Sequence, residues 1–400
     1  MTGSRQENRV IAANPKAAGR EAGAASRDRI TWVGASLVVV PLGREINDAK
    51  VLTGRQKPLT EVDLLVVEIA SAEGHRGLGF SYTLRVGGPA LLAHAHEVAE
   101  GLLGEDPNDI SRLWDKLAWW SASLGRAGLA VQSIAAFDTA LWDLKARRAG
   151  LPLAKLLGAQ RDSVRCYNTS GGYLSSDVGE MKERASASLA RGIGGIKLKV
   201  GQPDPMIDLQ RIEAMRSHLG EGVPLMIDAN QQWDRTTARR FGRIVEPLNL
   251  VWIEEPLDAH DFEGHAALAA ELATPIATGE MLSSVDEHVK LIQAGGADFI
   301  QADAPRVGGI TPFLKICTLA ELNRLNLAPH MVMEIHLHLA AAYASEPWVE
   351  HFEWLEPVFN ERLEIAGGRM LVPDRPGLGL TLSAAAADWT RGTAEFGRRP

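Results

Sequence analysis

Hydrophobic positions along the chain change their spacing near residue 150. Before that point, two extended apolar runs are followed by three segments with helical spacing, 90–103, 110–120 and 129–149. Gly150 and Pro152 then supply a helix stop signal. This pattern predicts a small α+β domain over residues 29–150. The polar segment 48–58 between the two runs holds a glycine, a proline and three cations, which is typical of a mobile surface loop.

Beyond Cys166 the pattern becomes a regular alternation. Short apolar runs alternate with amphipathic helical segments seven or eight times, and the runs are 163–168, 195–200, 224–227, 250–253, 275–278, 299–301, 327–329 and 348–349. Alternating strands and helices imply parallel strands joined by right-handed crossovers. The pattern therefore predicts an α/β chain with a (β/α)8 barrel, or a barrel with one unit altered, over residues 151–362.

The two ends of the chain lie outside this scheme. Residues 1–28 are rich in Ala, Arg, Gly and Ser and have no apolar core, which favours a flexible tail over a secretory signal. A glycine-rich extended stretch begins at Leu363. We expect the C-terminal segment 363–400 to return to the first domain.

Composition narrows the class of protein. Of the 400 residues, 46% are hydrophobic and 23% are charged, as in soluble globular proteins. The net charge of −8 argues against nucleic acid as a partner. Cys166 and Cys317 are too few for a disulfide framework, and no apolar run approaches the roughly 20 residues of a membrane helix. We expect a reduced, cytoplasmic protein without a membrane partner.

A titratable residue lies at the same end of seven of the eight predicted barrel strands. These residues are Lys199, Asp228, Glu254, Glu280, Asp303, His330 and Glu350. The intervals between them are 29, 26, 26, 23, 27 and 20 residues, and one barrel unit takes about 30 residues. The carboxyl ends of the strands form the mouth of a barrel, where active sites are assembled. We therefore expect these side chains to converge on one site.

Three of these residues are acids from neighbouring strands. Unpaired carboxylates brought together would repel each other strongly, and a divalent cation removes that repulsion. Ligation by oxygen alone, without His or Cys, fits Mg²⁺. Asp228, Glu254 and Glu280 are thus candidate metal ligands. The alternative is that the three are separate surface acids pointing into solvent. Their recurrence at the same end of neighbouring strands disfavours this alternative.

Basic groups flank the acids on both sides. Lys197 and Lys199 point the same way from one strand, and Asp303 one strand before His330 can orient the imidazole. A lysine crowded by a second lysine and a metal can have its pKa lowered enough to act as a base. Two bases beside a metal suggest proton abstraction next to a carboxylate, with the metal stabilising the enediolate charge. Salt-bridged barrel lysines and a core histidine are the alternatives.

Other candidates are weaker. Glu334, His336 and His338 have metal-ligand chemistry, but a spacing of two on a helix separates the histidines. The pair Gly308-Gly309 has low specificity as a phosphate loop. His94 and His96 are expected on a helix surface.

At these residues the chain resembles the mandelate racemase branch of the enolase superfamily. The matching motifs are Lys197-x-Lys199, Asp228-x-Asn230, Trp252-Ile253-Glu254-Glu255-Pro256, Gly279-Glu280 and the pair Asp303 and His330. The resemblance runs from about Arg29 onward. It implies an N-terminal α+β capping domain with a modified TIM barrel, (β/α)7β.

Within that branch, several segments resemble bacterial dehydratases that act on L-talarate and galactarate. These are 48–58, 104–109, 166–172, 230–234, 328–330 and 351–354. The resemblance implies Mg²⁺-dependent removal of water from six-carbon diacid sugars, giving a 2-keto-3-deoxy product, with epimerisation by some members. It implies Asp228, Glu254 and Glu280 as Mg²⁺ ligands and Lys199 and His330 as acid/base residues.

The same resemblance assigns the substrate contacts. Lys197 polarises the substrate carboxylate, and Glu350 forms a hydrogen bond near it. The distal end of a diacid needs a clamp of its own, for which the capping domain offers candidates: Asp48, Ala49, Arg55, Lys57 and Arg85. Leu84 departs from this expectation, because a second cation would be easily accommodated at its position beside Arg85. The apolar side chain leaves the identity of the diacid undecided.

Two other functions stay open. A racemase or epimerase would use the same bases without loss of water, and a catalytically inactive barrel would serve as a binding or scaffold protein. The complete set of ligands and bases speaks against the second. A homo-oligomer is expected from the family.

Overall fold

The computed structural model describes residues 28–169 and 172–399. The predicted tail therefore lies outside the described residues except for Asp28, which is buried and accepts a hydrogen bond from the Glu73 amide at 3.0 Å. Ser170 and Gly171, which belong to one of the resembling segments, also lie outside them.

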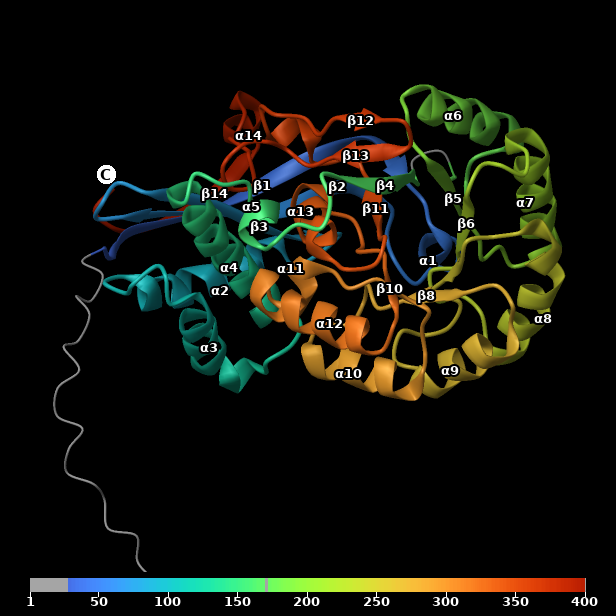
Figure 1. The fold of residues 1–400 in the computed structure, drawn as a ribbon, viewed down its shortest axis with the longest axis horizontal. Helices are drawn as coiled ribbons and strands as arrows, with labels where there is room; N and C mark the ends of the chain where they lie inside the picture. The colour runs from blue at the N-terminus through green and yellow to red at the C-terminus, as the bar shows by residue number, and fades with distance from the viewer. Residues whose placement is uncertain (1–27, 170–171, 400) are drawn as a thin grey trace, which may run out of the picture.

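The N-terminal half is built on a four-stranded antiparallel sheet (Figure 1). Its order is β14 (Thr390–Gly397), β1 (Ile30–Ile46), β2 (Leu59–Ser71) and β3 (Arg76–Leu84). The outermost strand β14 comes from the C-terminus and pairs with β1 from Trp32↔Gly397 to Val38↔Thr390. The middle parts of the long strands, 37–40 in β1 and 64–67 in β2, are apolar on both faces because both faces are largely buried there.

One face of this sheet is covered by helices and the other by the barrel. The helices are α2 (Gly88–Ala99), α3 (Ile110–Trp120) and α4 (Leu129–Arg148), with short turns η1 (Glu100–Leu102) and η2 (Ala122–Leu124). On the opposite face, Leu64 and Phe80 share a core with barrel residues such as Phe313. His94, expected on a surface, is buried and hydrogen-bonded to Ser121 at 2.8 Å.

Among the residues that the structure describes, eight parallel strands form the barrel, and seven helical connections join them. The strands are β4 (Ser163–Asn168), β5 (Gly195–Lys199), β6 (Leu225–Asp228), β7 (Ile253–Glu254), β8 (Ile276–Thr278), β9 (Phe299–Ile300), β10 (Asn326–Leu327) and β11 (Trp348–His351). The connections contain α6 (Val178–Ala190), α7 (Pro205–Leu219), α8 (Arg235–Val245) with η3 (Glu246–Leu248), α9 (Phe262–Glu271), α10 (Val285–Ala294), α11 (Ala304–Val307) with α12 (Ile310–Leu322), and α13 (Met333–Ala342).

The eighth unit is altered. After β11 the short turn η4 (Glu356–Val358) stands where a barrel helix would follow, and β11 pairs in parallel with β4. This is the (β/α)7β arrangement, with a capping domain beside it. The helices α6 to α10 run around the outer rim in Figure 1.

Two segments differ from the pattern read along the chain. The polar stretch after Asn47 holds a helical turn, α1 (Ala49–Leu52), because the Asp48 side chain accepts hydrogen bonds from the amides of Lys50 and Val51. After the barrel, the hairpin β12 (Ile365–Ala366) and β13 (Arg369–Leu371) pairs with β4 of the barrel before the chain reaches α14 (Ala384–Asp388) and β14. The short helix α5 (Leu153–Leu156) lies between α4 and β4. The four predicted domain ranges stay predictions.

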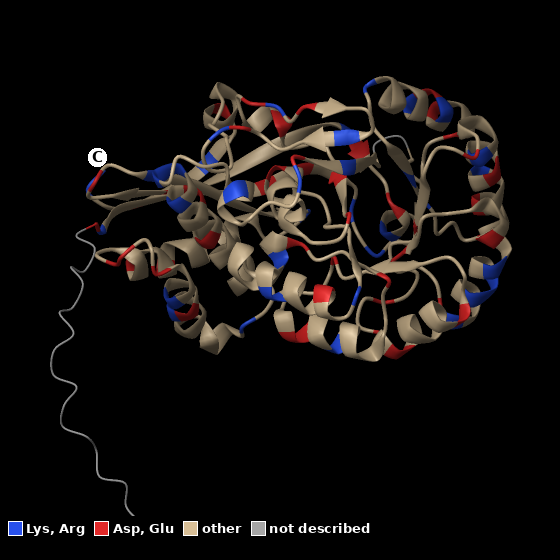
Figure 2. Cartoon of the chain, in the orientation of Figure 1, with Lys and Arg blue, Asp and Glu red and all other residues tan. Residues whose placement is uncertain are grey.

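Charges of both signs are mixed along the outer barrel helices in the view of Figure 2. Neighbouring helices are joined by exposed ion pairs, such as Arg235 with Asp261 and Arg243 with Glu271. Such pairs contribute about 0–1 kcal/mol each, so the buried core and the strand ladder hold the barrel together. No helix of the described residues is both long and apolar enough to cross a membrane.

Strand β3 packs backbone to backbone on α4, and this contact depends on glycine. A Cβ atom at Gly79 would lie within 3.0 Å of backbone atoms of Ala136 and Ala140. We therefore expect Gly79→Ala to lower stability by about 3 kcal/mol, since neither backbone can move cheaply. Thermal unfolding measures this loss. Gly43→Ala on β1 is the matched control, because nothing lies within 4 Å of its added Cβ; an equal loss in both variants would contradict the packing argument.

Candidate active site

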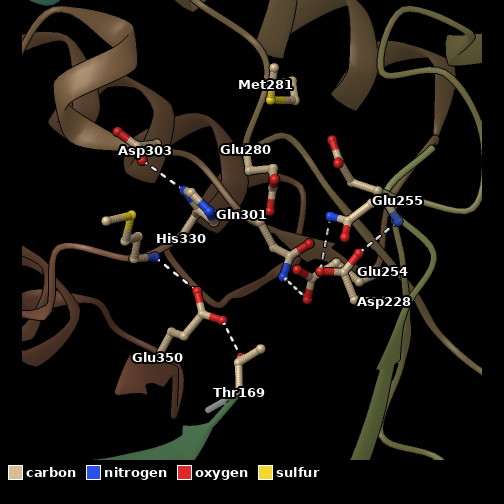
Figure 3. A network of polar contacts seen from close by, with 12 residues as sticks. Thr169, Asp228, Glu254, Glu255, Glu280, Met281, Gln301, Asp303, His330 and Glu350 are labelled. Carbon is tan, nitrogen blue, oxygen red and sulfur yellow. Dashed lines mark hydrogen bonds and ion pairs between the residues drawn. The ribbon is translucent and has the colours of Figure 1, made fainter. Parts of the chain in front are cut away.

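The ends of three neighbouring barrel strands bring three carboxylates together (Figure 3). Asp228 ends β6 and Glu254 ends β7, and the two are direct partners in the parallel ladder. Glu280 follows β8 after Gly279, whose positive φ of 126° is a backbone conformation that favours glycine. One oxygen from each carboxylate lies within 4.8 Å of the other two, and all three residues are buried.

Two lysines on β5 reach the same acids. Lys199 is the ladder partner of Asp228 and forms an ion pair with it. Lys197 Nζ lies 2.5 Å from Glu254 Oε1 and 2.8 Å from Glu350 Oε1. The structure thus brings both predicted lysines to the predicted acids.

These contacts set the charges of the site. Burial works against the charge on Asp228, but Lys199 and Lys197 outweigh burial and hold the pKa of Asp228 below its usual value. Burial and the Asp228 charge raise the pKa of Glu254. Burial also lowers the pKa of Lys199, but the Asp228 charge outweighs it and leaves that pKa above its usual value. In this arrangement the ion pair with Asp228 therefore outweighs the lowering effect of Lys197, and the lowered pKa expected for a lysine beside both a second lysine and a metal stays a prediction.

Neighbouring residues hold the acids in place through hydrogen bonds. Glu254 Oε2 accepts hydrogen bonds from Gln301 Nε2 at 2.7 Å and Trp252 Nε1 at 3.0 Å. Asp228 Oδ1 accepts one from the Asn230 amide at 2.8 Å. The sequence alone did not assign Gln301 a role, although its position directly after β9 places it at the same barrel end.

The three acids fit a divalent cation. The Glu280 Oε2 atom is buried and has no hydrogen-bond partner among the described residues, although His330 Nε2 lies 3.5 Å away. All the candidate ligand atoms are carboxylate oxygens, which Mg²⁺ prefers as ligands. Three converging buried carboxylates, one of which keeps an oxygen without a hydrogen-bond partner, are what such an ion requires.

Asp303 and His330 form a hydrogen-bonded pair next to these acids (Figure 3). His330 Nδ1 lies 2.8 Å from Asp303 Oδ2, and burial of Asp303 is offset by His330, which holds the pKa of Asp303 below its usual value. An ionised carboxylate only accepts, so Nδ1 carries the hydrogen and Nε2 faces Glu280 with a free lone pair. This leaves Nε2 able to take a proton.

Glu350 lies on the other side of His330. It accepts hydrogen bonds from the Thr169 hydroxyl at 2.7 Å and from the Met331 amide at 2.9 Å. Burial would raise the pKa of Glu350, but Lys197 and the neighbouring cations lower it to about 2. Glu350 is therefore an ionised partner that fixes Lys197.

A cavity of about 210 Å³ lies between these residues and the capping domain. Its polar and charged lining residues from the capping domain are Asp48, Lys50, Gln56, Thr83, Arg85 and Gln132, and from the barrel side Tyr173, Lys199, Asn230, Glu280, Arg306 and His330. The two predicted bases, Lys199 and His330, thus line the same cavity as the predicted metal ligand Glu280. Leu84 lines it as well.

The predicted distal clamp is only partly assembled around this cavity. Arg85 contacts Asp48 at 2.9 Å, and its Nε donates to the Lys57 carbonyl oxygen at 2.6 Å. The side chains of Arg55 and Lys57 are exposed and do not line the cavity, and Ala49 is buried in α1. The capping residues that sequence reasoning missed are Lys50, Gln56 and Tyr82; the first two lie in the polar segment 48–58, whose three cations were the available signal.

The weaker candidates have structural roles. His336 Nε2 accepts from the Ala304 amide at 3.0 Å, and Ala154 donates to His338 Nδ1 at 3.2 Å. Burial lowers the pKa of each histidine to about 4, so both are neutral core residues. Gly309 lets α4 approach α12 closely, because a Cβ there would collide with Asp138.

Two family models match most of the chain. Residues 180–386 match the model "Enolase C-terminal domain-like", and residues 53–158 match "Mandelate racemase / muconate lactonizing enzyme, N-terminal domain". The L-talarate/galactarate dehydratase of Salmonella typhimurium LT2 is 60% identical over 96% of this chain and 97% of its own length. The 3,6-anhydro-alpha-L-galactonate cycloisomerase of Streptomyces coelicolor is 35% identical over 88% of this chain and 97% of its own length.

Solved structures agree with this assignment. The crystal structure of L-talarate dehydratase from Polaromonas sp. JS666, complexed with Mg and L-glucarate, is 66% identical and superposes with a TM-score of 0.91. The match covers 93% of this chain and all of that chain. The fold, both family models and these relatives agree, and the chain belongs to the mandelate racemase and muconate lactonizing enzyme family of the enolase superfamily.

Proposed function

We propose that this chain is a Mg²⁺-dependent dehydratase of six-carbon diacid sugars, with L-talarate and galactarate as its substrates. The observation that carries the proposal is the placement of two bases, Lys199 and His330, on one cavity with three converging buried carboxylates. The 60% identity to a relative named L-talarate/galactarate dehydratase supports this substrate class.

Asp228, Glu254 and Glu280 would hold the Mg²⁺. When bound, the ion supplies positive charge that stabilises the negative charge developing on the substrate carboxylate during proton removal. Lys197, fixed between Glu254 and Glu350, adds a second positive charge next to that carboxylate. The buried setting strengthens both effects because little water screens them.

The two bases share the proton transfers. One base takes the proton from the carbon next to the carboxylate, and the other gives a proton to the leaving β-hydroxyl, so that water departs. The resulting enol gains a proton at the β-carbon and loses its hydroxyl proton, which gives the 2-keto-3-deoxy acid. His330 Nε2 is suited to either task because Asp303 holds the hydrogen at Nδ1.

The capping domain would bind the distal end of the diacid. Arg85 and Lys50 supply positive charge in the cavity, and Asp48 fixes Arg85. The predicted contacts from Arg55 and Lys57 would require these exposed side chains to turn toward the cavity. A homo-oligomer and a cytoplasmic location remain predictions.

A substrate screen tests the function. The protein is incubated with six-carbon diacid and monoacid sugars with Mg²⁺, with and without EDTA, and a 2-keto product is detected. An EDTA-sensitive product with galactarate or L-talarate is the expected result. Epimerisation without a keto product would favour a racemase or epimerase, and absence of Mg²⁺ binding by calorimetry would favour a non-catalytic binding protein.

A further inference from the structure

Tyr82 of the capping domain reaches the histidine–aspartate pair of the barrel. It lies near the end of β3 and is fully buried. Its hydroxyl lies 2.6 Å from Asp303 Oδ2 and 3.2 Å from His330 Nδ1. A side chain from one domain therefore contacts both members of a pair that belongs to the other.

The pattern of donors and acceptors fixes the direction of these hydrogen bonds. An ionised carboxylate only accepts, so the Tyr82 hydroxyl and His330 Nδ1 both donate to Asp303 Oδ2. Burial and the Asp303 charge raise the pKa of Tyr82 well above its usual value, so the hydroxyl keeps its proton. Asp303 Oδ1 accepts from the Arg306 amide at 3.0 Å, which leaves the carboxylate held at both oxygens.

The hydroxyl is carried by a rigid support. Tyr82 pairs with Leu64 in the sheet, and its carbonyl oxygen accepts a hydrogen bond from Gln132 Nε2 at 3.0 Å. Asp138 of α4 accepts a hydrogen bond from the Thr311 hydroxyl at 2.6 Å, which fastens the capping domain to the barrel. Groups held by packed elements in this way are preorganised for function.

We propose that Tyr82 is a positioning residue through which the capping domain orients Asp303 and His330, so that proton transfer by His330 depends on it and proton transfer by Lys199 does not. The asymmetry follows from the contacts, because Lys199 on β5 is held by Asp228 at the end of β6. This inference rests on the proposed function and extends it from the barrel to the capping domain.

The test separates the two bases. Tyr82→Phe is introduced into full-length Lys199→Ala, where His330 alone can exchange the proton next to the carboxylate, and into His330→Asn, where Lys199 alone can. Exchange in D2O with Mg²⁺ is followed by NMR on galactarate and L-talarate, which differ in configuration next to a carboxylate. We expect exchange by His330 to slow about 10- to 100-fold, as for other residues that orient catalytic groups, and exchange by Lys199 to stay unchanged.

Tyr343→Phe is the matched control, because this buried hydroxyl donates to the Leu325 carbonyl oxygen at 2.6 Å. It should alter neither exchange. If Tyr82→Phe slows exchange equally in both backgrounds, Tyr82 has only a general structural role. If exchange by His330 is unchanged, Tyr82 does not position the pair. Either result overturns the inference. If the wild-type protein exchanges the proton next to the carboxylate in neither diacid, the proposed function fails and the inference fails with it.

Discussion

Turnover of the diacid substrate is expected to fall about 10²- to 10⁴-fold in Lys199→Ala and, separately, in His330→Asn, which is the usual contribution of a positioned acid or base. Dehydration needs one group to take a proton and another to protonate the departing hydroxyl, so neither base can substitute for the other. The loss should appear in kcat more than in KM, since in the proposed mechanism the substrate carboxylate is bound by Lys197 and the metal site, which both variants keep. Steady-state kinetics on the diacid that gives product in the wild type measures it.

The controls are a lysine and a histidine on the barrel surface. Lys155 is exposed and paired with Asp162, and His218 is exposed beside Ser186. Lys155→Ala and His218→Asn should leave turnover unchanged. Full turnover in folded Lys199→Ala and His330→Asn proteins would exclude both residues as bases and with them the proposed mechanism.

The barrel and its ring of strand-end residues were predictable from two features of the sequence. Apolar runs alternate with helical segments, and titratable residues recur at the same end of successive strands. A strand-end residue once per unit predicts that Asp228 and Glu254 meet, and the ladder makes them direct partners. The structure also brings Lys197, Lys199, Asp303, His330 and Glu350 to one site, although their chemical roles stay proposals. The (β/α)7β architecture came from the family resemblance and is confirmed.

The contacts between the domains could not be predicted from the same pattern. Tyr82 reads as one more inward residue of an apolar strand, and its partner Asp303 lies 221 residues away in the sequence. Only the docking of two domains decides which polar groups meet, and no periodicity encodes that docking. The same limit applies to the clamp, where Lys57 supplies its carbonyl oxygen rather than its ammonium group to Arg85.

Neutralising one of the three acids is expected to abolish Mg²⁺ binding and most of the activity. In Glu254→Gln the side-chain oxygen can still accept hydrogen bonds from Trp252 and Gln301, and Lys197 keeps its ion pair with Glu350. The variant should therefore fold, while the site loses one of its negative charges. Losing about 4 kcal/mol of charge stabilisation corresponds to about a thousandfold loss of rate.

Calorimetry and thermal unfolding measure this effect without relying on turnover. Mg²⁺ that binds only the folded protein raises the unfolding midpoint, so added Mg²⁺ should stabilise the wild type and not Glu254→Gln. Treatment with EDTA should reproduce the activity loss in the wild type, and Mg²⁺ should restore it there alone. Glu271→Gln, an exposed acid on α9 paired with Arg243, is the matched control and should behave as the wild type. Because Glu254 touches Asp228 across the ladder while Glu271 lies on the outer surface, equal Mg²⁺ affinity in the two variants would place the metal elsewhere and remove the electrostatic basis of the mechanism.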